Sequence, residues 1–283
     1  MLPKSNLEQK VIQLLHGGAV KSTRLVQMLV AEEQITFQAV YAAVRRLRHD
    51  EIVLVQGKKL ILNSVWLEQM GAFFSKAQKV YLTKAPEESF SFGTLEEGDR
   101  VTYKFKNPVL LDQVWGQVFF ELVKRVSIDV PIMIYNPHYW FPIVRQESEA
   151  TIFKWLQAEG HKAYFATAST STLDSRTIKE FLKDMSHSYS LGVQKGYENN
   201  FYMNIIGDYL IEVTLDESIS AKIDGFFAVR ESCTTQDVNV LRGIVESVGK
   251  NKIVISRNKT KAKRIRTSIA KHFLVEERNR KHL

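Results

Sequence analysis

The sequence is poor in the features that mark secreted, disulfide-stabilised and membrane-spanning proteins. Its single cysteine, Cys233, excludes an intramolecular disulfide framework and a cysteine-rich zinc site. No apolar run approaches the roughly 20 residues that a helix needs to span a bilayer. The first ten residues contain no apolar signal region. These absences predict a soluble, cytoplasmic protein that does not interact with membranes.

The sequence also lacks the short motifs of several hydrolase classes. It contains neither His-Glu-x-x-His, which binds zinc in metalloproteases, nor Gly-x-Ser-x-Gly, which presents a nucleophilic serine. Cys233 has no neighbouring signature of a catalytic thiol. We therefore expect no catalytic residues, no metal site and no cofactor, and we predict that the protein is not an enzyme.

Positive charge is abundant but unevenly distributed. The 283 residues include 39 Lys and Arg against 31 Asp and Glu, which gives a net charge of +8. Residues 250–283 carry a net charge of +10 and residues 1–72 carry +3, whereas residues 73–249 carry −5. An anionic partner is therefore expected at the two ends and not along the middle. The length predicts about two domains, and a hydrophobic content of 45% is typical of globular proteins.

The first seventy residues follow the order helix, helix, helix, hairpin. Apolar residues recur at helical spacing in three segments, and Gly57-Lys58 separates two short apolar runs as a hairpin turn does. This order predicts a winged helix-turn-helix domain over residues 1–64. The expected elements are a helix over about 7–17 capped by Asn6, a helix from Ser22 or Thr23, a helix to about 49 capped by Thr36, and strands over 52–55 and 60–62.

The third predicted helix has two faces of opposite character. Phe37, Val40, Val44 and Leu47 are expected to form its buried stripe. A helix that is apolar on one side and cationic on the other can enter the major groove of double-stranded DNA, and lysines at a hairpin tip can contact phosphates. The expected DNA-binding residues are Thr36, Gln38, Tyr41, Arg45, Arg46 and Arg48 on the helix, and Lys58 and Lys59 on the wing.

The segment from Thr36 to Val53 resembles the recognition helix and first wing strand of winged-helix transcriptional regulators, and in particular the TrmB-like regulators of bacteria and archaea. The order of strands and helices over 100–283 is similar to the phospholipase-D-like effector domain of these regulators. None of the seven histidines begins the catalytic pattern of that fold, His-x-Lys followed by Asp. The resemblance therefore implies an effector domain without phosphodiesterase activity.

Two regions follow the predicted wing. Residues 65–83 form an apolar segment, expected as a helix capped by Ser64 that serves as a linker or dimerisation element, or else packs against its own body. Residues 84–99 are expected as a loop-rich boundary, and alternating strand and helix patterns then predict an α/β domain with a mixed sheet over 84–283, so that the chain is α+β overall. The expected strands are 100–106, 131–135, 162–167, 201–206, 209–215 and 252–256, and the expected helices are 109–125, 150–158, 174–185 capped by Asp174, one after the strand 209–215 capped by Asp216, 235–248 and one from about 259.

Two loops of this domain follow predicted strands, where open α/β sheets bind ligands. We expect His138 and Trp140 in one loop, and Ser169 and Thr170 in the other, to bind a small polar effector. The alternative is that the aromatic residues belong to the core and that the hydroxyl residues form an ordinary loop.

The basic C-terminal segment is expected to be a docked helix with a cationic outer face. Its apolar stripe would consist of Ile265, Ile269, Phe273 and Leu274. The outer face could be simply solvated, could contact phosphates, or could pack against the acidic body or a partner subunit.

Together these features predict a sequence-specific, DNA-binding transcriptional regulator that forms a homodimer and senses a small-molecule effector through its C-terminal domain. Two alternatives remain open: a nucleic-acid-processing enzyme that docks through the winged helix, and a winged helix that only assembles proteins.

Overall fold

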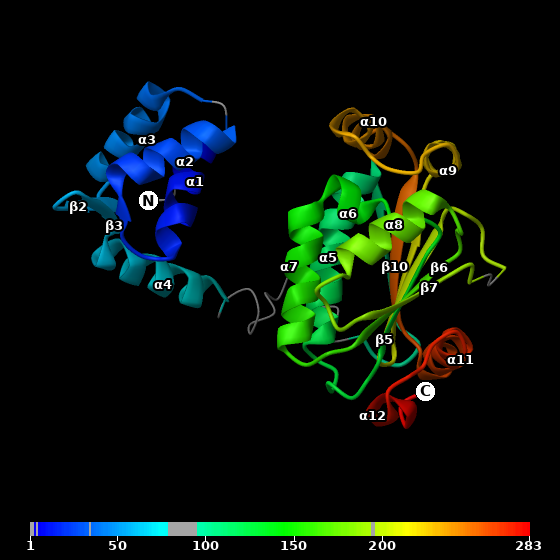
Figure 1. Cartoon of the computed structure of the whole chain (residues 1–283). Coiled ribbons are helices and arrows are strands. Elements are labelled where there is room, and N and C mark those ends of the chain that lie inside the picture. The colour runs from blue at the N-terminus through cyan, green and yellow to red at the C-terminus, as the bar shows by residue number, and fades with distance from the viewer. Residues whose placement is uncertain (1–2, 4, 34, 79–94, 194–195) are drawn as a thin grey trace. The chain divides into compact units, whose positions relative to one another are not determined.

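The computed structural model describes residues 3, 5–33, 35–78, 95–193 and 196–283 (Figure 1). Contacts between residues divide the chain into two compact units, Met1–Ser89 and Phe90–Leu283, and each has its own apolar core. The predicted fold class is confirmed, because a winged helix-turn-helix precedes a larger α/β unit with a mixed sheet. Most of the predicted boundary loop and the end of the predicted linker helix, residues 79–94, lie outside the described residues. Within the described ranges no helix is long and apolar enough to cross a membrane.

The first unit packs three helices and a three-stranded antiparallel sheet around one core. The sheet has the order β1-β3-β2, and strand β1 was not predicted because it is only two residues long. The buried side chains of the core come from all three helices and from the two wing strands. The elements are α1 (Asn6–His16), β1 (Val20–Lys21), α2 (Ser22–Glu33), α3 (Phe37–His49), β2 (Val53–Gln56), β3 (Lys59–Leu62) and α4 (Ser64–Gln78).

Two of the predicted helix caps in this unit were wrong by one residue. Ser5, not Asn6, caps α1, because the Ser5 backbone is extended and its hydroxyl accepts a hydrogen bond from the Glu8 amide. Asn63, not Ser64, precedes α4, and its Oδ1 accepts from the Val65 amide at 3.0 Å. Thr36 caps α3 as predicted, since its hydroxyl accepts from the Ala39 amide at 3.2 Å.

Helix α3 ends in a Schellman motif that has a glutamate in the position usually taken by glycine. The Glu51 amide donates to the Arg48 carbonyl, and the Ile52 amide donates to the Leu47 carbonyl at 2.9 Å. Glu51 has φ = 57°, and Ile52 and Leu47 are both buried. This turn fixes the direction in which the chain leaves α3 and enters the wing.

The larger unit is built on a seven-stranded sheet with the order β4-β10-β9-β8-β5-β6-β7. Strands β5, β6 and β7 are parallel, and the remaining neighbours are antiparallel. The strands are β4 (Arg100–Phe105), β5 (Ile132–Asn136), β6 (Ala163–Thr167), β7 (Ser188–Leu191), β8 (Phe201–Ile206), β9 (Tyr209–Thr214) and β10 (Asn251–Arg257). The helices are α5 (Pro108–Val123), α6 (Phe141–Val144), α7 (Gln146–Ala158), α8 (Thr172–Phe181), α9 (Glu217–Ala228), α10 (Thr235–Val245), α11 (Lys259–Ala270) and α12 (Glu277–Arg280).

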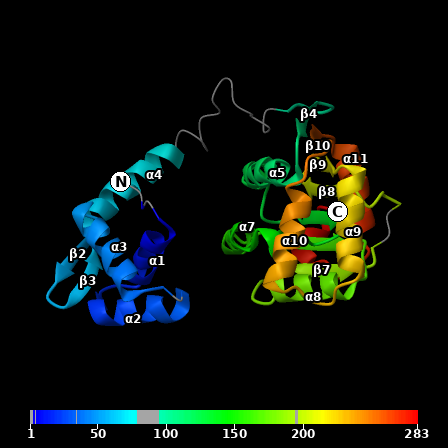
Figure 2. The ribbon, with the colours of Figure 1, turned by 90° about the horizontal axis from the view of Figure 1, so that it is seen from above.

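The two faces of this sheet are covered unequally. Helices α5 to α10 contribute to the main core on one face, whereas α11 and the residues after it cover part of the opposite face (Figure 2). On that second face, the outward residues of β4 and β10 include Arg100, Lys104 and Lys252, all of which are exposed. The elements α6, β7 and α12 were not predicted, since each is only four residues long.

The C-terminal segment is docked on the sheet, as predicted. Ile265 and Ile269 are buried as predicted, and the buried Arg266 donates to the Gly207 carbonyl at 2.6 Å. Burial lowers the pKa of this guanidinium. The prediction for Leu274 was wrong, because α11 ends at Ala270 and Leu274 is 94% exposed in the turn that follows.

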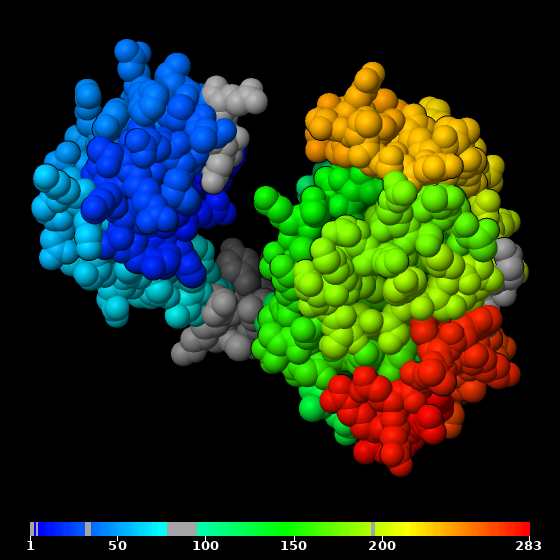
Figure 3. All heavy atoms as spheres, in the orientation of Figure 1, coloured from blue at the N-terminus to red at the C-terminus, as the bar shows by residue number. Residues whose placement is uncertain are grey.

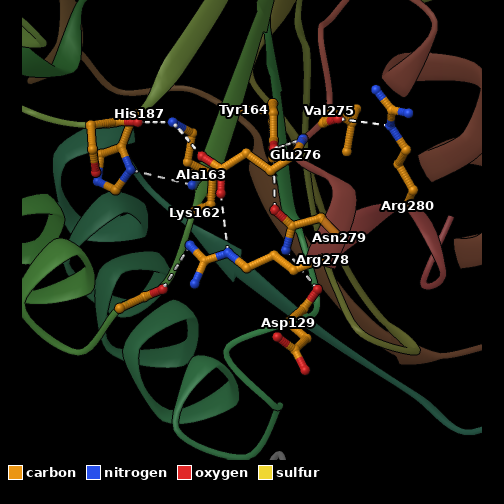
Figure 4. A network of polar contacts seen from close by, with 12 residues as sticks. Asp129, Lys162, Ala163, Tyr164, His187, Val275, Glu276, Arg278, Asn279 and Arg280 are labelled. Carbon is orange, nitrogen blue, oxygen red and sulfur yellow. Dashed lines mark hydrogen bonds and ion pairs between the residues drawn. The ribbon is translucent and has the colours of Figure 1, made fainter.

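The last described residues are held by a network of polar contacts (Figure 4). The fully buried Asn279 donates from Nδ2 to the Asp129 carbonyl at 2.6 Å, and its Oδ1 accepts from the Tyr164 hydroxyl at 3.2 Å. The Glu276 amide donates to the same hydroxyl, and the Glu276 carboxylate pairs with Lys162 at 3.2 Å. These contacts, together with α11, make the C-terminal residues one continuous surface region of the larger unit (Figure 3).

Candidate functional site

Helix α3 presents a polar and cationic face on the outside of the first unit. The side chains of Gln38, Tyr41, Arg45 and Arg48 are exposed along this helix. The opposite side is buried against the core and consists of Val40, Ala43, Val44 and Leu47. From Gln38 to Arg48 the exposed face extends over about 15 Å at 1.5 Å per residue, which is comparable to the width of a DNA major groove.

Phe37 belongs to the exposed side of α3, so its predicted place in the buried stripe was wrong. Its side chain is 54% exposed, and Ala43 takes its place among the buried residues. At 100° per residue Phe37 lies about 70° from the centre of the buried stripe, on the side of Arg48 and Tyr41. Thr36 is exposed at the start of the same face.

Arg46 lies on a different side of α3 from Arg45 and Arg48. Its Nε donates to Glu8 Oε1 at 2.6 Å, and the Glu8 side chain is only 3% exposed. The pair joins α3 to α1 and compensates the buried carboxylate. Arg46 therefore has a structural partner within the unit, whereas Arg45 and Arg48 project from the exposed face.

The wing carries three neighbouring cations. Gly57, with φ = 63°, occupies the first central position of a two-residue turn that joins Gln56 to Lys59. Lys58 and Lys59 are exposed at this tip, as predicted. Lys21 on β1 lies directly opposite Lys59 and is also exposed, a position that the sequence did not reveal because β1 was not predicted. Like charges directly opposite one another in a sheet repel, so an anion placed between them is favoured.

The two predicted effector loops of the larger unit do lie side by side. The Ala168 amide donates to the Asn136 carbonyl at 3.0 Å, and the Ser169 amide donates to the Pro137 carbonyl. His138 Nδ1 lies 2.7 Å from Asp174 Oδ2, and His138 Nε2 lies 3.1 Å from Asp224 Oδ1. Only the first of these contacts is a hydrogen bond, because Asp224 Oδ1 has no hydrogen bond of acceptable geometry and lies at ion-pair distance.

His138 therefore joins the loop after β5 to helices α8 and α9. The carboxylate of Asp174 is fully buried and also accepts from the Tyr139 amide at 2.7 Å. Asp174 was predicted as the cap of its helix, but Ser171 is the cap, and its hydroxyl accepts from the Asp174 amide. The arrangement holds three elements together and leaves His138 only 8% exposed.

Of the four predicted effector residues, His138 and Trp140 are buried, Ser169 is half-buried and Thr170 is exposed. Trp140 is 1% exposed and stacks on Phe141 with ring centroids 3.9 Å apart. Trp140 is therefore a core residue, which was the alternative to a role in effector binding. Thr170 is exposed, and Ser169 is half-buried with its hydroxyl accepting from the Ser171 amide. These residues lie in neighbouring loops, but none of them lines the cavity between α5, α7 and the sheet.

A cavity that was not predicted from the sequence lies between α5, α7 and the sheet. Asp112 on α5 and Glu149 on α7 both line it. Arg145, which directly precedes α7, pairs with Asp112. Burial raises the pKa of Asp112 to about 6, while Arg145 opposes the shift. Burial and the charge of Asp112 raise the pKa of Glu149 to about 8. The two carboxyls lie 37 positions apart in the sequence, so no local motif marks the pair.

The sequence matches no protein-family model and no curated protein. Among solved structures, the chain is similar to TrmBL2, an archaeal chromatin protein described as showing a novel mode of DNA binding. The identity is 9%, the TM-score is 0.36, and the match covers 94% of this chain and 91% of that one. It is also similar to NucT from Helicobacter pylori, with 10% identity and a TM-score of 0.36, over 62% of this chain and 96% of that one.

Proposed function

We propose that this protein is a sequence-specific, DNA-binding transcriptional regulator that acts as a homodimer. The observation that carries the proposal is the exposed face of α3, on which Gln38, Tyr41, Arg45 and Arg48 lie opposite a fully apolar stripe. Arginine and glutamine side chains form the bidentate contacts that distinguish guanine and adenine in the major groove.

The wing supports the same proposal by a different mechanism. Lys21, Lys58 and Lys59 form a compact cationic group that matches the phosphate backbone beside the groove. Phosphate contacts position a protein on DNA and add affinity for every sequence, whereas base contacts discriminate between sequences. The two groups of residues are therefore expected to have separable effects on binding.

The test is DNA binding by the full chain, measured by fluorescence anisotropy on a duplex selected from a random library and on a scrambled duplex. Arg45→Ala should lose about 1–3 kcal/mol on the selected duplex and little on the scrambled one. Lys58→Ala should weaken both duplexes alike and reduce the slope of log K against log salt by about 1. Lys222→Ala, an exposed lysine of the larger unit, is the matched control.

Three results would contradict the proposal. Absence of binding to any duplex at low salt would leave the protein-assembly alternative. Cleavage of the duplex in the presence of Mg²⁺ would support a nucleic-acid-processing enzyme instead. Unchanged binding by both variants would show that α3 and the wing do not contact DNA.

The homodimer in this proposal follows from geometry on DNA. Two winged helices can contact two half-sites one helical turn apart, about 34–36 Å, if the chains pair symmetrically. An effector of the larger unit would change DNA affinity only by favouring one arrangement of the two winged helices over another.

A further inference from the structure

The larger unit contains a cavity of about 40 Å³ between α5 and α7. Its floor is formed by the sheet, through Ile134 on β5, Phe165 on β6 and Asn204 on β8. An engineered apolar cavity of about 150 Å³ accommodates benzene, which has six heavy atoms. By proportion, this cavity has room for a group of about two heavy atoms.

Several of the polar groups that line the cavity can accept hydrogen bonds. They include the carboxyls of Asp112 and Glu149, the side chain of Asn136 and the hydroxyl of Tyr139. Asn136 is 3% exposed and Tyr139 is 2% exposed. The two side chains lie beside each other, yet neither Asn136 Oδ1 nor the Tyr139 hydroxyl has a hydrogen bond of acceptable geometry. A donor placed in the cavity would satisfy these buried groups.

The charges around the cavity are unbalanced by one. Arg145 pairs with Asp112, so the two carboxyls share a single guanidinium. When both carboxyls are ionised, the group Asp112, Arg145 and Glu149 has a net charge of −1. Without another cation Glu149 retains a proton at neutral pH, since its pKa is raised to about 8 by burial and by Asp112. A bound monocation would replace that proton.

Aromatic rings form most of the remaining wall. Trp115, Phe119, Phe141 and Phe153 all line the cavity, and Trp115 meets Phe141 edge to face at 5.1 Å. The faces of such rings attract cations, and organic ammonium groups are recognised by aromatic rings combined with carboxylates. Anionic ligands do not fit this lining, because both carboxyls would repel them.

The cavity has an opening between the two helices. Most of its lining is buried, but Gly116 on α5 and Glu149 and Ile152 on α7 are partly exposed. A Cβ atom at Gly116 would lie 3.5 Å from Ile152 Cδ1, so the absence of a side chain at Gly116 leaves space at this point. A ligand longer than the cavity could extend to solvent there.

We propose that this cavity binds a small primary ammonium group, either as a short free alkylamine or as the head of a longer amine. The ammonium group donates hydrogen bonds to Glu149, to Asn136 Oδ1 and to the Tyr139 hydroxyl, and the aromatic rings surround its carbon. The carboxylate of Glu149 balances its charge. This inference does not depend on the proposed DNA-binding function.

The test uses methylammonium, which has two heavy atoms, as the probe for the full chain in ligand-observed saturation-transfer NMR. The affinity should rise about tenfold between pH 7 and pH 9, because the ionised fraction of a group with a pKa of about 8 rises from about 0.09 to about 0.91. Asp112, Arg145 and Tyr139 are the other titratable groups that face Glu149. Potassium chloride at equal ionic strength should not displace the probe.

Two variants make the test specific. Glu149→Gln keeps the shape of the side chain but cannot balance the charge, so it should weaken methylammonium binding at pH 9 at least tenfold. Glu147→Gln, an exposed carboxylate on the same helix, should bind like the unmodified chain. Saturation transfer that is absent, that potassium abolishes, or that Glu149→Gln preserves would overturn the proposal. The first result would indicate a cavity that holds only water, and the second an inorganic cation site.

Discussion

Two adjacent arginines on α3 illustrate how differently neighbouring residues can be used. Arg45 projects from the exposed face, whereas Arg46 pairs with the buried carboxylate of Glu8. One position along a helix rotates the side chain by 100°, so adjacent residues face different surroundings. The sequence predicted both as DNA-binding residues because composition alone does not show which of them has a partner inside the unit.

We expect the two arginines to differ in their effects on stability and binding. Arg46→Ala should lower the free energy of unfolding of the first unit by about 1–2 kcal/mol, because it leaves Glu8 buried without this partner. This loss of stability is smaller than that for a fully buried ion pair because Arg46 itself is 53% exposed. Arg45→Ala should change stability by less than about 0.5 kcal/mol.

Hydrogen exchange of α1 and α3 in the full chain measures this difference, and DNA binding is measured in parallel. Exchange in α1 that is unaffected by Arg46→Ala would show that the ion pair contributes little. A loss of stability in Arg45→Ala would show that its side chain has packing contacts that the exposed position does not suggest.

Helix α4 exposes more large apolar side chains than α1, α2 or α3 does. Val65, Leu67, Phe73 and Phe74 are each between 47% and 63% exposed. An exposed apolar face of this kind commonly marks a surface that contacts another protein. This observation leaves open both original hypotheses for this segment, dimerisation and packing against the larger unit.

The double variant Phe73→Glu/Phe74→Glu distinguishes them. If α4 pairs two chains, the variant should sediment as a monomer and lose affinity for a duplex with two half-sites, with little change for a single half-site. Val229→Glu, another exposed apolar position, is the control. A variant that remains dimeric would exclude α4 as the dimer contact and favour its packing against the larger unit.

One buried amide, that of Asn279, connects α12 to Tyr164 on β6 and to the Asp129 carbonyl. Replacing Asn279 by alanine removes the hydrogen bonds to Tyr164 and to the Asp129 carbonyl, which should cost about 1–3 kcal/mol. Amides of α12 should then exchange faster than in the unmodified chain. Arg280→Ala is the matched control, because Arg280 is exposed and its side chain donates to the Val275 carbonyl, a neighbour in the same segment. Equal exchange in both variants would argue against the role assigned to Asn279.

Long elements with a clear period were predictable from the sequence, and short elements were not. Strands β5, β6, β8 and β9 carry buried residues at nearly every position, β4 alternates, and helices α3 and α5 have broad apolar faces, so their approximate ranges were recognisable. Elements such as β1 and β7 exist only because a partner strand is present, which is a tertiary effect. The cavity depends on α5 and α7 meeting over the sheet, and for this reason Asp112 and Glu149 could not be paired from the sequence.

The two carboxyls that line the cavity make the stability of the larger unit depend on pH. The pKa of Glu149 is raised to about 8 and that of Asp112 to about 6, whereas ordinary values are near 4. At these two carboxyls the folded state therefore binds more protons than the unfolded state between about pH 4 and pH 8. Their contribution to stability is greatest at the acidic end of this window and decreases as the pH rises through the folded pKa values.

We expect the urea midpoint of the larger unit to fall from pH 5.5 to pH 8 more steeply in the unmodified chain than in Glu149→Gln. When the midpoint is converted to a free energy of unfolding, the slopes of this free energy against pH should differ between the two chains by at most about 1.4 kcal/mol per pH unit, the value for one proton. Burial lowers the pKa of His161 and His187, which acts in the opposite direction, so the comparison between the two chains isolates Glu149. Identical pH profiles would show that Glu149 does not titrate in this window.

The position of β10 in the sheet has a consequence for the order in which the molecule can be completed. Among the described strands, β4 pairs only with β10, from which it is separated by about 150 residues, whereas the winged helix closes through contacts within its first 62 residues. At a synthesis rate of about 5–20 residues per second, β4 waits on the order of 10–30 s for its partner. Its exposed Arg100 and Lys104 place charge on this edge, which disfavours pairing with strands of other chains during the interval. The exposed face of α3 can thus be folded while the sheet of the larger unit still lacks both β10 and β4.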